Sequence, residues 1–254
     1  MYINLLHLGR VPYSEALTIQ QQVIAARKQN LIADTLLLLE HPPVLTLGRN
    51  SHRDNVIVAD EFLASRNIEL HEINRGGDVT YHGPGQLVGY PIIDLRGDLP
   101  AKRGAFLGPV DFMRMLEEVL IRTCKDFGVL TQRIPKRTGV WTIPGGSIQE
   151  KKIAAMGIHV SQGVTSHGFA LNVTTDLRDF DWIIPCGITD RQVTSLELEV
   201  DPALNSQPLT MEAVANSVAR NFGHIFNRQM LWCESLKSLL ASIQKPEAAL
   251  ASKP

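Results

Sequence analysis

Residues 75–86 read RGGDVTYHGPGQ, and the chain continues as LVGYPIIDL over residues 87–95. The first segment is rich in glycine, which lets a backbone come close to a ligand and adopt dihedral angles closed to other residues. Polar groups around that backbone come from Arg75, Thr80, Tyr81, His82 and Gln86. The second segment is typical of a buried strand, so we expect the glycine segment (residues 75–86) to be anchored to a core and to contact a ligand. The plain alternative is a tight turn between two strands.

The composition is that of an ordinary globular protein. The 254 residues are 44% hydrophobic and 20% charged, with a formal net charge of -1. This balance gives no reason to expect a nucleic-acid or membrane partner, and no apolar run approaches the length of a membrane span. No interdomain linker is evident, so we expect one domain over residues 1–243 and a flexible tail over residues 244–254.

Cysteine usage indicates a reducing compartment. The three cysteines, Cys124, Cys186 and Cys233, are odd in number and widely spaced. This pattern supports neither a disulfide framework nor a zinc site, so we expect a cytoplasmic protein without a metal. The first residues also lack the features of a targeting segment.

The hydrophobic pattern predicts a mixed α/β fold. Ser14 and Asp60 are candidate helix N-caps, and Pro109 suits the first turn of a helix. Helices are expected over about residues 14–29, 60–65, 109–125 and 210–226, with a short one near 230–243. Strands are expected at residues 2–8, 35–39, 44–49, 68–73, 87–95, 140–141, 152–160 and 167–173, and a hairpin tip at 144–147.

A cysteine is the first candidate nucleophile. Cys124 and Cys233 fall in helical patterns and are expected in the core, whereas Cys186 stands between a proline and a glycine after an apolar run. A free thiol has a pKa near ~8.5, so a nucleophilic cysteine needs an activator. His82, His167 and Lys152 are candidates. On residue types alone, Cys186 can also be structural.

Lys152 leads the apolar strand expected at 152–160. The simplest interpretation is that it marks the solvent end of that strand. If it lies beside Cys186, its charge favours the thiolate. Strand alternation would point Lys151 and Lys152 to opposite faces, so only one of them can be the activator. The chain has no phosphate-loop motif, no His-Glu-x-x-His motif and no dinucleotide-binding glycine spacing.

The glycine segment, followed by Tyr90, resembles the signature of the lipoyl(octanoyl) transferases, which are enzymes of protein lipoylation. Further segments agree in order and character, and the combination, which covers about residues 2–226, is highly specific. These segments are 8–10 with 13–16, Glu40–Arg49, Lys152–Gly157, Ser166–Asn172, Ile184–Ile188 and Val193–Leu196. The connection over residues 142–150 is longer than the resemblance leads us to expect, and Asp78 stands where the signature looks variable.

The resemblance implies an α/β fold (α+β, with a mixed sheet) in a single domain similar to the catalytic domains of lipoate and biotin protein ligases. It implies transfer of an octanoyl or lipoyl group from octanoyl-acyl carrier protein to a lysine of a lipoyl domain. The expected acceptors are the E2 subunits of 2-oxoacid dehydrogenases and the glycine cleavage H protein. No cofactor is expected.

The resemblance also assigns the site. It makes Cys186 the acyl-thioester nucleophile and Lys152 the residue that lowers its pKa. The expected acyl-binding residues are Arg75, Gly76, Gly77, Asp78, Val79, Thr80, Tyr81, His82, Ala155, Met156, Gly157, Gly168, Phe169 and Ala170. The small residues among them suit a narrow acyl tunnel, although close packing of strands is the plain alternative for each.

Two other classes of protein remain to be weighed. An ATP-dependent lipoate-protein ligase would share the fold but activate the free acid as an adenylate, without a nucleophilic cysteine. Cys186 in its Pro-Cys-Gly setting argues against that reaction. A non-catalytic module that binds carrier proteins would keep the glycine segment without the Lys152 and Cys186 pair.

Overall fold

The computed structural model describes residues 1–97, 107–143, 149–184, 192–201 and 208–241. Within these ranges the main element is an eight-stranded sheet in the order β11-β1-β2-β6-β10-β9-β8-β7. Its strands are β1 (Tyr2–Arg10), β2 (Thr35–Glu40), β6 (Gln86–Ile92), β7 (Thr131–Ile134), β8 (Arg137–Thr142), β9 (Lys152–Ser161), β10 (Val164–Asn172) and β11 (Gln229–Trp232). The sheet is mixed, because β1 runs parallel to β2 and β11 while the pairs from β2 to β7 are antiparallel.

The strand predicted after the glycine segment lies at the centre of this sheet. Every residue of β6 is buried, and β6 pairs with β2 on one side and β10 on the other. The aliphatic run of β2 is equally buried. A strand that is covered on both faces needs a continuous apolar sequence, which explains why both segments lack polar alternation.

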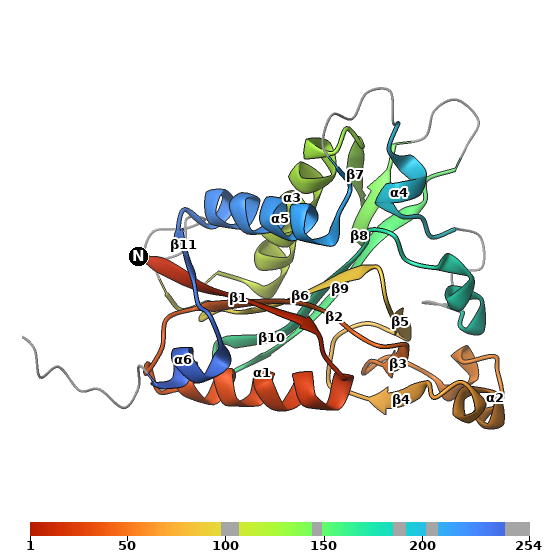
Figure 1. Cartoon of the computed structure of the whole chain (residues 1–254), viewed down its shortest axis with the longest axis horizontal. Helices are drawn as coiled ribbons and strands as arrows, with labels where there is room; N and C mark the ends of the chain where they lie inside the picture. The colour runs from red at the N-terminus through yellow and green to blue at the C-terminus, as the bar shows by residue number, and fades with distance from the viewer. Residues whose placement is uncertain (98–106, 144–148, 185–191, 202–207, 242–254) are drawn as a thin grey trace, which may run out of the picture.

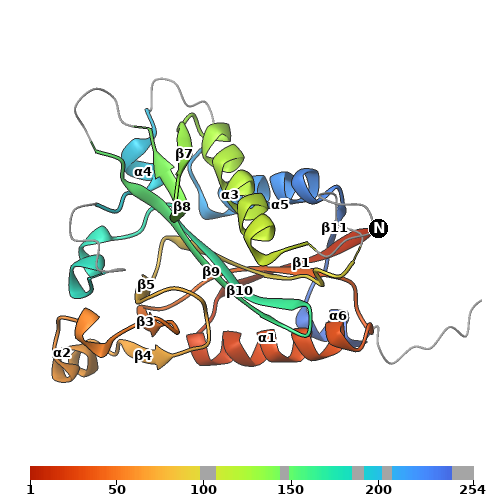
Figure 2. The ribbon, with the colours of Figure 1, turned by 180° about the vertical axis from the view of Figure 1, so that it is seen from behind.

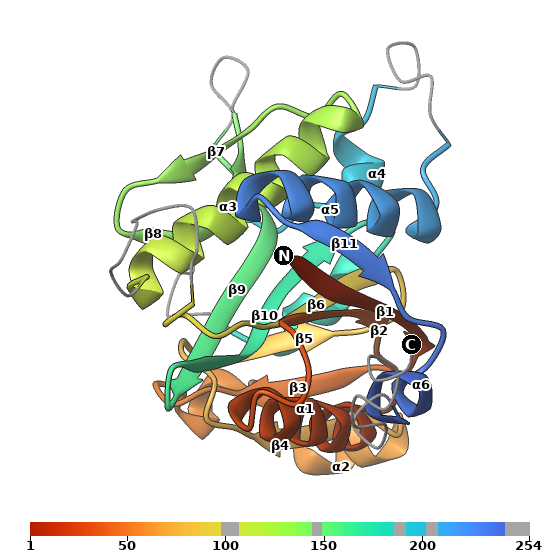
Figure 3. The ribbon, with the colours of Figure 1, turned by 90° about the vertical axis from the view of Figure 1, so that its left-hand side faces the viewer.

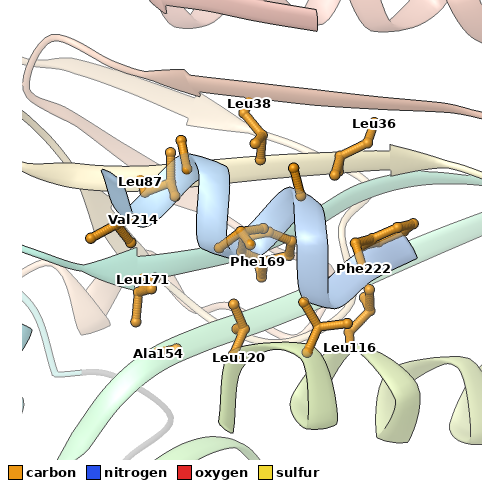
Figure 4. Close-up of a cluster of buried hydrophobic side chains, with 14 of the residues drawn as sticks. Leu36, Leu38, Leu87, Leu116, Leu120, Ala154, Phe169, Leu171, Val214 and Phe222 are labelled. Carbon is orange, nitrogen blue, oxygen red and sulfur yellow. The ribbon is translucent and has the colours of Figure 1, made fainter. Parts of the chain in front are cut away.

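Helices cover both faces of the large sheet (Figure 1). α3 (Pro109–Asp126) and α5 (Met211–Phe226) pack on one face, and α1 (Tyr13–Lys28) and α6 (Leu236–Ala241) pack on the other. The same layers are visible from behind and after a quarter turn (Figures 2 and 3). Figure 4 shows the core beneath α5, where Phe169 of β10 faces Leu120 and Phe222 of the covering helices.

A second, three-stranded sheet in the order β4-β3-β5 lies at one end of the large sheet (Figure 1). It consists of β3 (Val44–Leu47), β4 (Glu69–Glu72) and β5 (Thr80–His82). The short helix α2 (Asp60–Ser65) and the 3-10 turns η1 (Arg53–Asn55) and η2 (Leu177–Trp182) complete this region. Its core includes Leu45, Leu63 and Tyr81. The remaining short helix is α4 (Leu196–Glu199).

The structure corrects several sequence predictions of secondary structure. The predicted N-caps Ser14 and Asp60 both lie inside their helices, because Pro12 and Ala59 take the cap positions without a side-chain cap. The glycine segment is not one loop, because Thr80–His82 pairs with β3. β7 was not predicted at all.

The region near residues 230–243 is helical only in part. Gln229–Trp232 forms strand β11 beside β1, and the helix α6 begins at Leu236. Cys233 therefore lies outside a helix and is only partly buried, contrary to the prediction. Cys124 is fully buried in the core, as predicted.

Some predictions fall outside the described residues. These are the hairpin tip at 144–147, the flexible tail at 244–254 with the domain boundary at residue 243, and the position of Cys186. In the part of the chain that the structure describes, no helix is both long and apolar enough to cross a membrane.

Close packing between β6 and β10 predicts a stability effect. In Gly168→Ala, the new Cβ would overlap the carbonyl oxygen of Gly89 and lie 2.5 Å from Cδ of Pro91. Two buried strands would have to separate, so we expect the free energy of unfolding to fall by about 1–3 kcal/mol. Urea denaturation measures this change.

The matched control is Gly108→Ala, whose Cβ meets, among the described residues, only Asp111 Oδ2, at 3.5 Å. Because this glycine caps α3, the expected loss is under about 1 kcal/mol. Equal losses in the two variants would contradict the packing argument.

Candidate active site

A cavity of about 440 Å³ lies where the small sheet meets the large one. Its walls come from the glycine segment, from β6, β8, β9 and β10, and from single residues of α1, α3 and η2. Elements far apart in the sequence thus converge on one space. This is the arrangement expected of a small-molecule site.

The glycine segment reaches the cavity through two close backbone contacts. The N–H of Gly76 donates to the carbonyl of Ile158 in β9, at 3.1 Å. A Cβ at Gly157 would overlap the carbonyl oxygen of Gly76, and one at Gly48 would overlap that of Gly77. Glycine at positions 48 and 157 therefore allows the segment to lie between β3 and β9.

Arg75 directs its guanidinium back onto the same segment. Its Nη1 donates to the carbonyl of Gly76 at 2.9 Å, and its Nη2 donates to the carbonyl of Asp78 at 2.7 Å. The side chain thus fixes the conformation of the segment and also brings a permanent positive charge to the cavity wall.

His82 belongs to a buried chain of hydrogen bonds. Its Nδ1 is 2.7 Å from Oε1 of Gln86, Gln86 Nε2 donates to Oδ1 of Asn172 at 2.9 Å, and Asn172 Nδ2 donates to the carbonyl of Thr194 at 2.9 Å. Burial, together with the nearby His41, lowers the pKa of His82 to about 3. His82 is therefore neutral at neutral pH and acts as a hydrogen-bonding group.

A group of aromatic side chains packs against the His82 ring. Tyr13 stacks on His82 with ring centroids 6.1 Å apart, and His41 places its Nε2 2.7 Å from the hydroxyl of Tyr90. Burial lowers the pKa of His41 to about 4 and raises that of Tyr13 to about 12. Tyr13, His41 and His82 are all uncharged at neutral pH, so they can pack together without charge repulsion.

His167 has an unusual backbone within β10. Its φ of 57° lies in the left-handed region, which is uncommon for a residue other than glycine. Its N–H donates to Oε1 of the buried Gln20 at 3.0 Å, and its Nε2 is 2.8 Å from Oδ1 of Asn74. Burial, with a contribution from Arg75, lowers the pKa of His167 to about 4. Asn74 thus holds the neutral imidazole at the cavity wall, and Gln20 holds the backbone of the same residue.

Lys152 also lines the cavity. Its Nζ lies 4.8 Å from the centroid of the Trp141 ring, within the range of a cation–π interaction. Lys151 points elsewhere, with its Nζ 3.3 Å from Oε1 of Glu199. Of the two lysines, only Lys152 lines the cavity, and Lys151 lies just before β9 begins.

The described residues on either side of positions 185–191 are both tied to the site. The N–H of Ile184 donates to the carbonyl of Asn55, whose side-chain amide binds the carboxylate of Asp78 at 2.8 and 3.0 Å. At the other end, the N–H of Lys152 donates to the carbonyl of Gln192 at 3.0 Å. Ile184 is thus linked to the glycine segment through Asn55, and Gln192 lies beside Lys152.

The cavity brings together most of the residues predicted to bind the acyl group. Residues 75–80, His82, Ala155–Gly157 and Gly168–Ala170 all line it, as does Lys152. Tyr81 does not, because β5 alternates and directs this side chain into the core of the small sheet, where its hydroxyl donates to Asp179. Cys186 lies outside the described residues.

The glycines at positions 157 and 168 are explained by backbone packing, because an added Cβ would overlap a neighbouring carbonyl oxygen at each. This is the alternative that the sequence left open, and it requires no narrow tunnel. Other lining residues were not assigned to the acyl site from the sequence. They are Tyr13, Val88, Tyr90, Met113, Lys136, Arg137, Thr138, Trp141, Ile158, His167, Phe180 and Val193.

His167 had been considered only as a thiol activator, and two more of these residues had a usable signal. Val88 and Tyr90 alternate within a predicted strand, so their common face was readable from the sequence. Among the described residues, no three His, Cys, Asp or Glu side chains are grouped so as to hold a metal ion.

Comparisons with known proteins show which family the chain belongs to. Residues 12–223 match the model of the lipoyl protein ligase A/B catalytic domain. A protein from Acidobacterium capsulatum named octanoyltransferase is 63% identical over 96% of this chain and 98% of its own length. One of the same name from Koribacter versatilis is 51% identical over 94% of this chain and 90% of its own.

A solved structure shows the same fold at low identity. The bipartite lipoate protein ligase of Thermoplasma acidophilum superimposes with a TM-score of 0.69 at 16% identity, over 96% of this chain and 90% of that chain. At this identity the likeness concerns the fold alone. It confirms the predicted mixed α/β domain of the lipoate ligase type.

The chain therefore belongs to the family of lipoyl protein ligase A/B catalytic domains. Its curated relatives within that family are octanoyltransferases, which are acyltransferases, so the predicted class of enzyme is confirmed.

The buried histidines predict how stability depends on pH. His82 stays neutral in the folded protein down to about pH 3, whereas in the unfolded chain it takes up a proton below its ordinary pKa of 6.5. The unfolded state then binds more protons, so stability falls as the pH drops from 6.5 toward 4.5. Most carboxylates titrate below this pH range. Within the range, protonation of His82 in the unfolded chain lowers the free energy of unfolding by up to about 1.4 kcal/mol per pH unit.

Urea denaturation of the protein and of His82→Asn, in which the amide nitrogen replaces Nδ1, tests this. We expect a shallower dependence of the free energy of unfolding on pH in the variant. An identical slope would mean that His82 is not buried in its neutral form.

Proposed function

We propose that the protein transfers an octanoyl group from octanoyl-acyl carrier protein to a lysine of lipoyl domains, through a thioester on Cys186. The acceptors are the lipoyl domains of 2-oxoacid dehydrogenase E2 subunits and the glycine cleavage H protein, in the cytoplasm. The main support is Lys152, which lines the cavity while its backbone pairs with Gln192, next to the segment that holds Cys186. The names of the curated relatives support the octanoyl group.

The reaction proceeds in two acyl transfers. The Cys186 thiolate attacks the carbonyl carbon of the carrier thioester, a tetrahedral oxyanion forms, and the pantetheine sulfur leaves and takes up a proton. The neutral amine of the acceptor lysine then attacks the enzyme thioester; the nitrogen loses a proton to solvent, the carbon–sulfur bond breaks, and the amide and the Cys186 thiolate are released. A thioester is converted to an amide, which is downhill, so the reaction requires no ATP.

Lys152 has an electrostatic role in this scheme. A cation near the thiol favours the thiolate, and one pKa unit is a tenfold change in the thiolate fraction at a pH below the pKa. The Trp141 ring lies beneath the ammonium of Lys152, and the ring face attracts a cation. Trp141 is itself fully buried, so this support is rigid.

The cavity suits an acyl chain of medium length. Apolar walls come from Val88, Met156, Phe169 and Ala170. About seven buried carbon groups at ~0.8 kcal/mol each would supply roughly 5–6 kcal/mol of binding. A chain two carbons longer or shorter would thus be rejected only modestly unless the cavity has a firm end wall.

An ATP-dependent lipoate-protein ligase is the alternative, since a lipoate protein ligase has the same fold. That reaction needs no nucleophilic cysteine. Detection of an octanoyl thioester on Cys186 distinguishes the two reactions, because the ligase reaction does not form one.

Incubation with octanoyl-acyl carrier protein without ATP should add one octanoyl mass to the peptide that contains Cys186. The adduct should disappear when a lipoyl domain is added, because the acceptor lysine discharges the thioester. Intact-protein and peptide mass spectrometry measure both steps. Cys124 should stay unmodified, because it is fully buried and burial raises the pKa of its thiol to about 12.

Cys186→Ser is the control for the adduct. If this variant accumulates the acyl group and transfers it at the normal rate, the covalent mechanism is wrong. If the protein acylates the lipoyl domain only with ATP and free octanoate, the ligase reaction replaces the proposed one.

Lys152→Ala should raise the pKa of the Cys186 thiol by about 1–3 units, because it removes a nearby positive charge. The measurement is the rate of alkylation against pH, corrected with Cys186→Ser for reaction at other cysteines. Lys151→Ala is the matched control, since Lys151 pairs with Glu199 away from the cavity. An unchanged profile in Lys152→Ala, or equal shifts in both variants, would remove Lys152 from this role.

A further inference from the structure

The cavity carries an excess of positive charge. Among the described lining residues, four are cationic, namely Arg75, Lys136, Arg137 and Lys152, and the only carboxylate is Asp78. The cavity histidines do not change this balance, because His82 and His167 are neutral at neutral pH. The whole chain, by contrast, has a formal net charge of -1. A concave surface with charge of one sign attracts a ligand of the opposite sign.

An octanoyl thioester is neutral, so the acyl group itself does not account for this charge. Arg75 donates hydrogen bonds to carbonyls of its own segment, and Lys152 lies over Trp141 beside the segment that holds Cys186. These two cations have roles inside the site. Lys136 and Arg137 remain to be explained.

Arg137 is the clearest case. Its side chain makes no hydrogen bond and no ion pair with any residue that the structure describes, although its Nη1 is buried. The neighbouring arginines differ, because Arg114 and Arg133 bind the carboxylate of Glu117 at 2.6 and 3.1 Å. Glu117 also accepts the N–H of Gly139, so this carboxylate is shared by two arginines and a backbone amide, and Arg137 is not among its partners. A buried guanidinium nitrogen without a partner is unfavourable unless a ligand supplies an acceptor.

The turn between β7 and β8 presents Lys136 beside Arg137. Ile134 pairs with Arg137 across a two-residue turn of Pro135 and Lys136, and Lys136 has a φ of 63°. Proline followed by a residue with positive φ is the pattern of a type II turn, which usually has glycine at the second position. A lysine there is strained and exposed, and its side chain lines the cavity. The turn thus holds two adjacent cations at the rim.

We propose that Lys136 and Arg137 form a phosphate subsite, which binds the phosphodiester of the pantetheine arm of the acyl donor. This inference rests on the proposed function, since it concerns the donor of that reaction. A guanidinium fork can bind two phosphate oxygens at once, and the lysine adds a point charge.

The length of the donor arm fits this assignment. Trp141 pairs with Lys152 across the sheet, and Arg137 is four residues earlier in the same strand, which is about 13 Å at ~3.3 Å per residue. From sulfur to phosphorus, the extended arm has roughly thirteen bonds of ~1.3–1.5 Å, which advance about 16 Å after bond angles are allowed for. A sulfur near Lys152 and a phosphate near Arg137 can therefore belong to one donor.

Two small donors that differ only in the phosphate test the subsite. Octanoyl-4′-phosphopantetheine and octanoyl-pantetheine are compared by kcat/KM for transfer to a lipoyl domain, with the wild-type protein and Arg137→Gln. We expect the wild-type protein to prefer the phosphorylated donor. The preference should shrink about tenfold or more in Arg137→Gln, because charge-assisted hydrogen bonds to the phosphate are lost. Arg137→Lys should retain part of the preference.

Arg122→Gln is the matched control. It removes the same charge from an exposed ion pair with Glu118, and Arg122 does not line the cavity. Its donor preference should equal that of the wild-type protein. Equal loss of activity with both donors in Arg137→Gln would overturn the phosphate subsite, as would a wild-type protein that does not distinguish them.

A third donor, octanoyl-acyl carrier protein, tests whether Arg137 binds the phosphate or acidic groups on the carrier surface. If Arg137→Gln slows transfer from octanoyl-acyl carrier protein but keeps the preference between the small donors, Arg137 contacts the carrier protein and the subsite is wrong. If the wild-type protein transfers from none of the donors, the proposed function fails. The subsite is then judged by calorimetry with 4′-phosphopantetheine and pantetheine, of which only the first should bind.

Discussion

The hydrogen bond from Gly76 to the carbonyl of Ile158 is the contact on which the site depends. It holds the glycine segment against β9, and it is possible only because position 157 has no Cβ. Everything that the segment brings to the cavity follows from this approach. Arg75 lies one residue before the contact, and β5 with His82 begins four residues after it. The two sheets therefore enclose a space instead of packing directly on each other.

The positive charge of the cavity comes from its arginines and lysines, whereas its imidazoles are neutral. Burial is the largest cause of the low pKa values of His82 and His167, and the positive charge of Arg75 lowers both further. Neither imidazole carries a proton that it can give away near neutral pH. The sequence offered His82 and His167 as activators of a thiol, but a neutral imidazole with so low a pKa is a weak base. Lys152 is the remaining candidate, since its ammonium acts through its charge.

The parts of the fold that were predictable are those with strong local patterns. β6 and β9 have long apolar runs, and α3 begins at a proline that fixed its start correctly. β11 was missed because four residues between helical patterns give no period that distinguishes a strand from a helix. Its pairing with β1 is a tertiary effect, as residues 2–5 and 229–232 are adjacent only in the folded chain.

The same distinction applies to the site. The glycine segment could be assigned to it from composition, but Tyr81 was misplaced because β5 was not recognised as a strand, and alternation turns this side chain away. Lys136, Arg137 and Trp141 come from β8 and the turn before it. Nothing in their own sequence indicates a cavity, because the cavity wall that they form exists only after β8 pairs with β9.

The fold is shared with a lipoate protein ligase at 16% identity, so the architecture alone does not specify the reaction. Both substrates contain a phosphate, which in an acyl adenylate is bonded to the acyl carbon through one oxygen and in an acyl-pantetheine thioester lies roughly thirteen bonds from the sulfur. A cationic cavity alone therefore does not separate the two reactions. What differs is the source of activation: an adenylate is made at the site from a free acid, whereas a thioester arrives activated and needs only a nucleophile to receive its acyl group. A nucleophilic thiol is needed for the second reaction and has no function in the first, which is why the choice depends on Cys186.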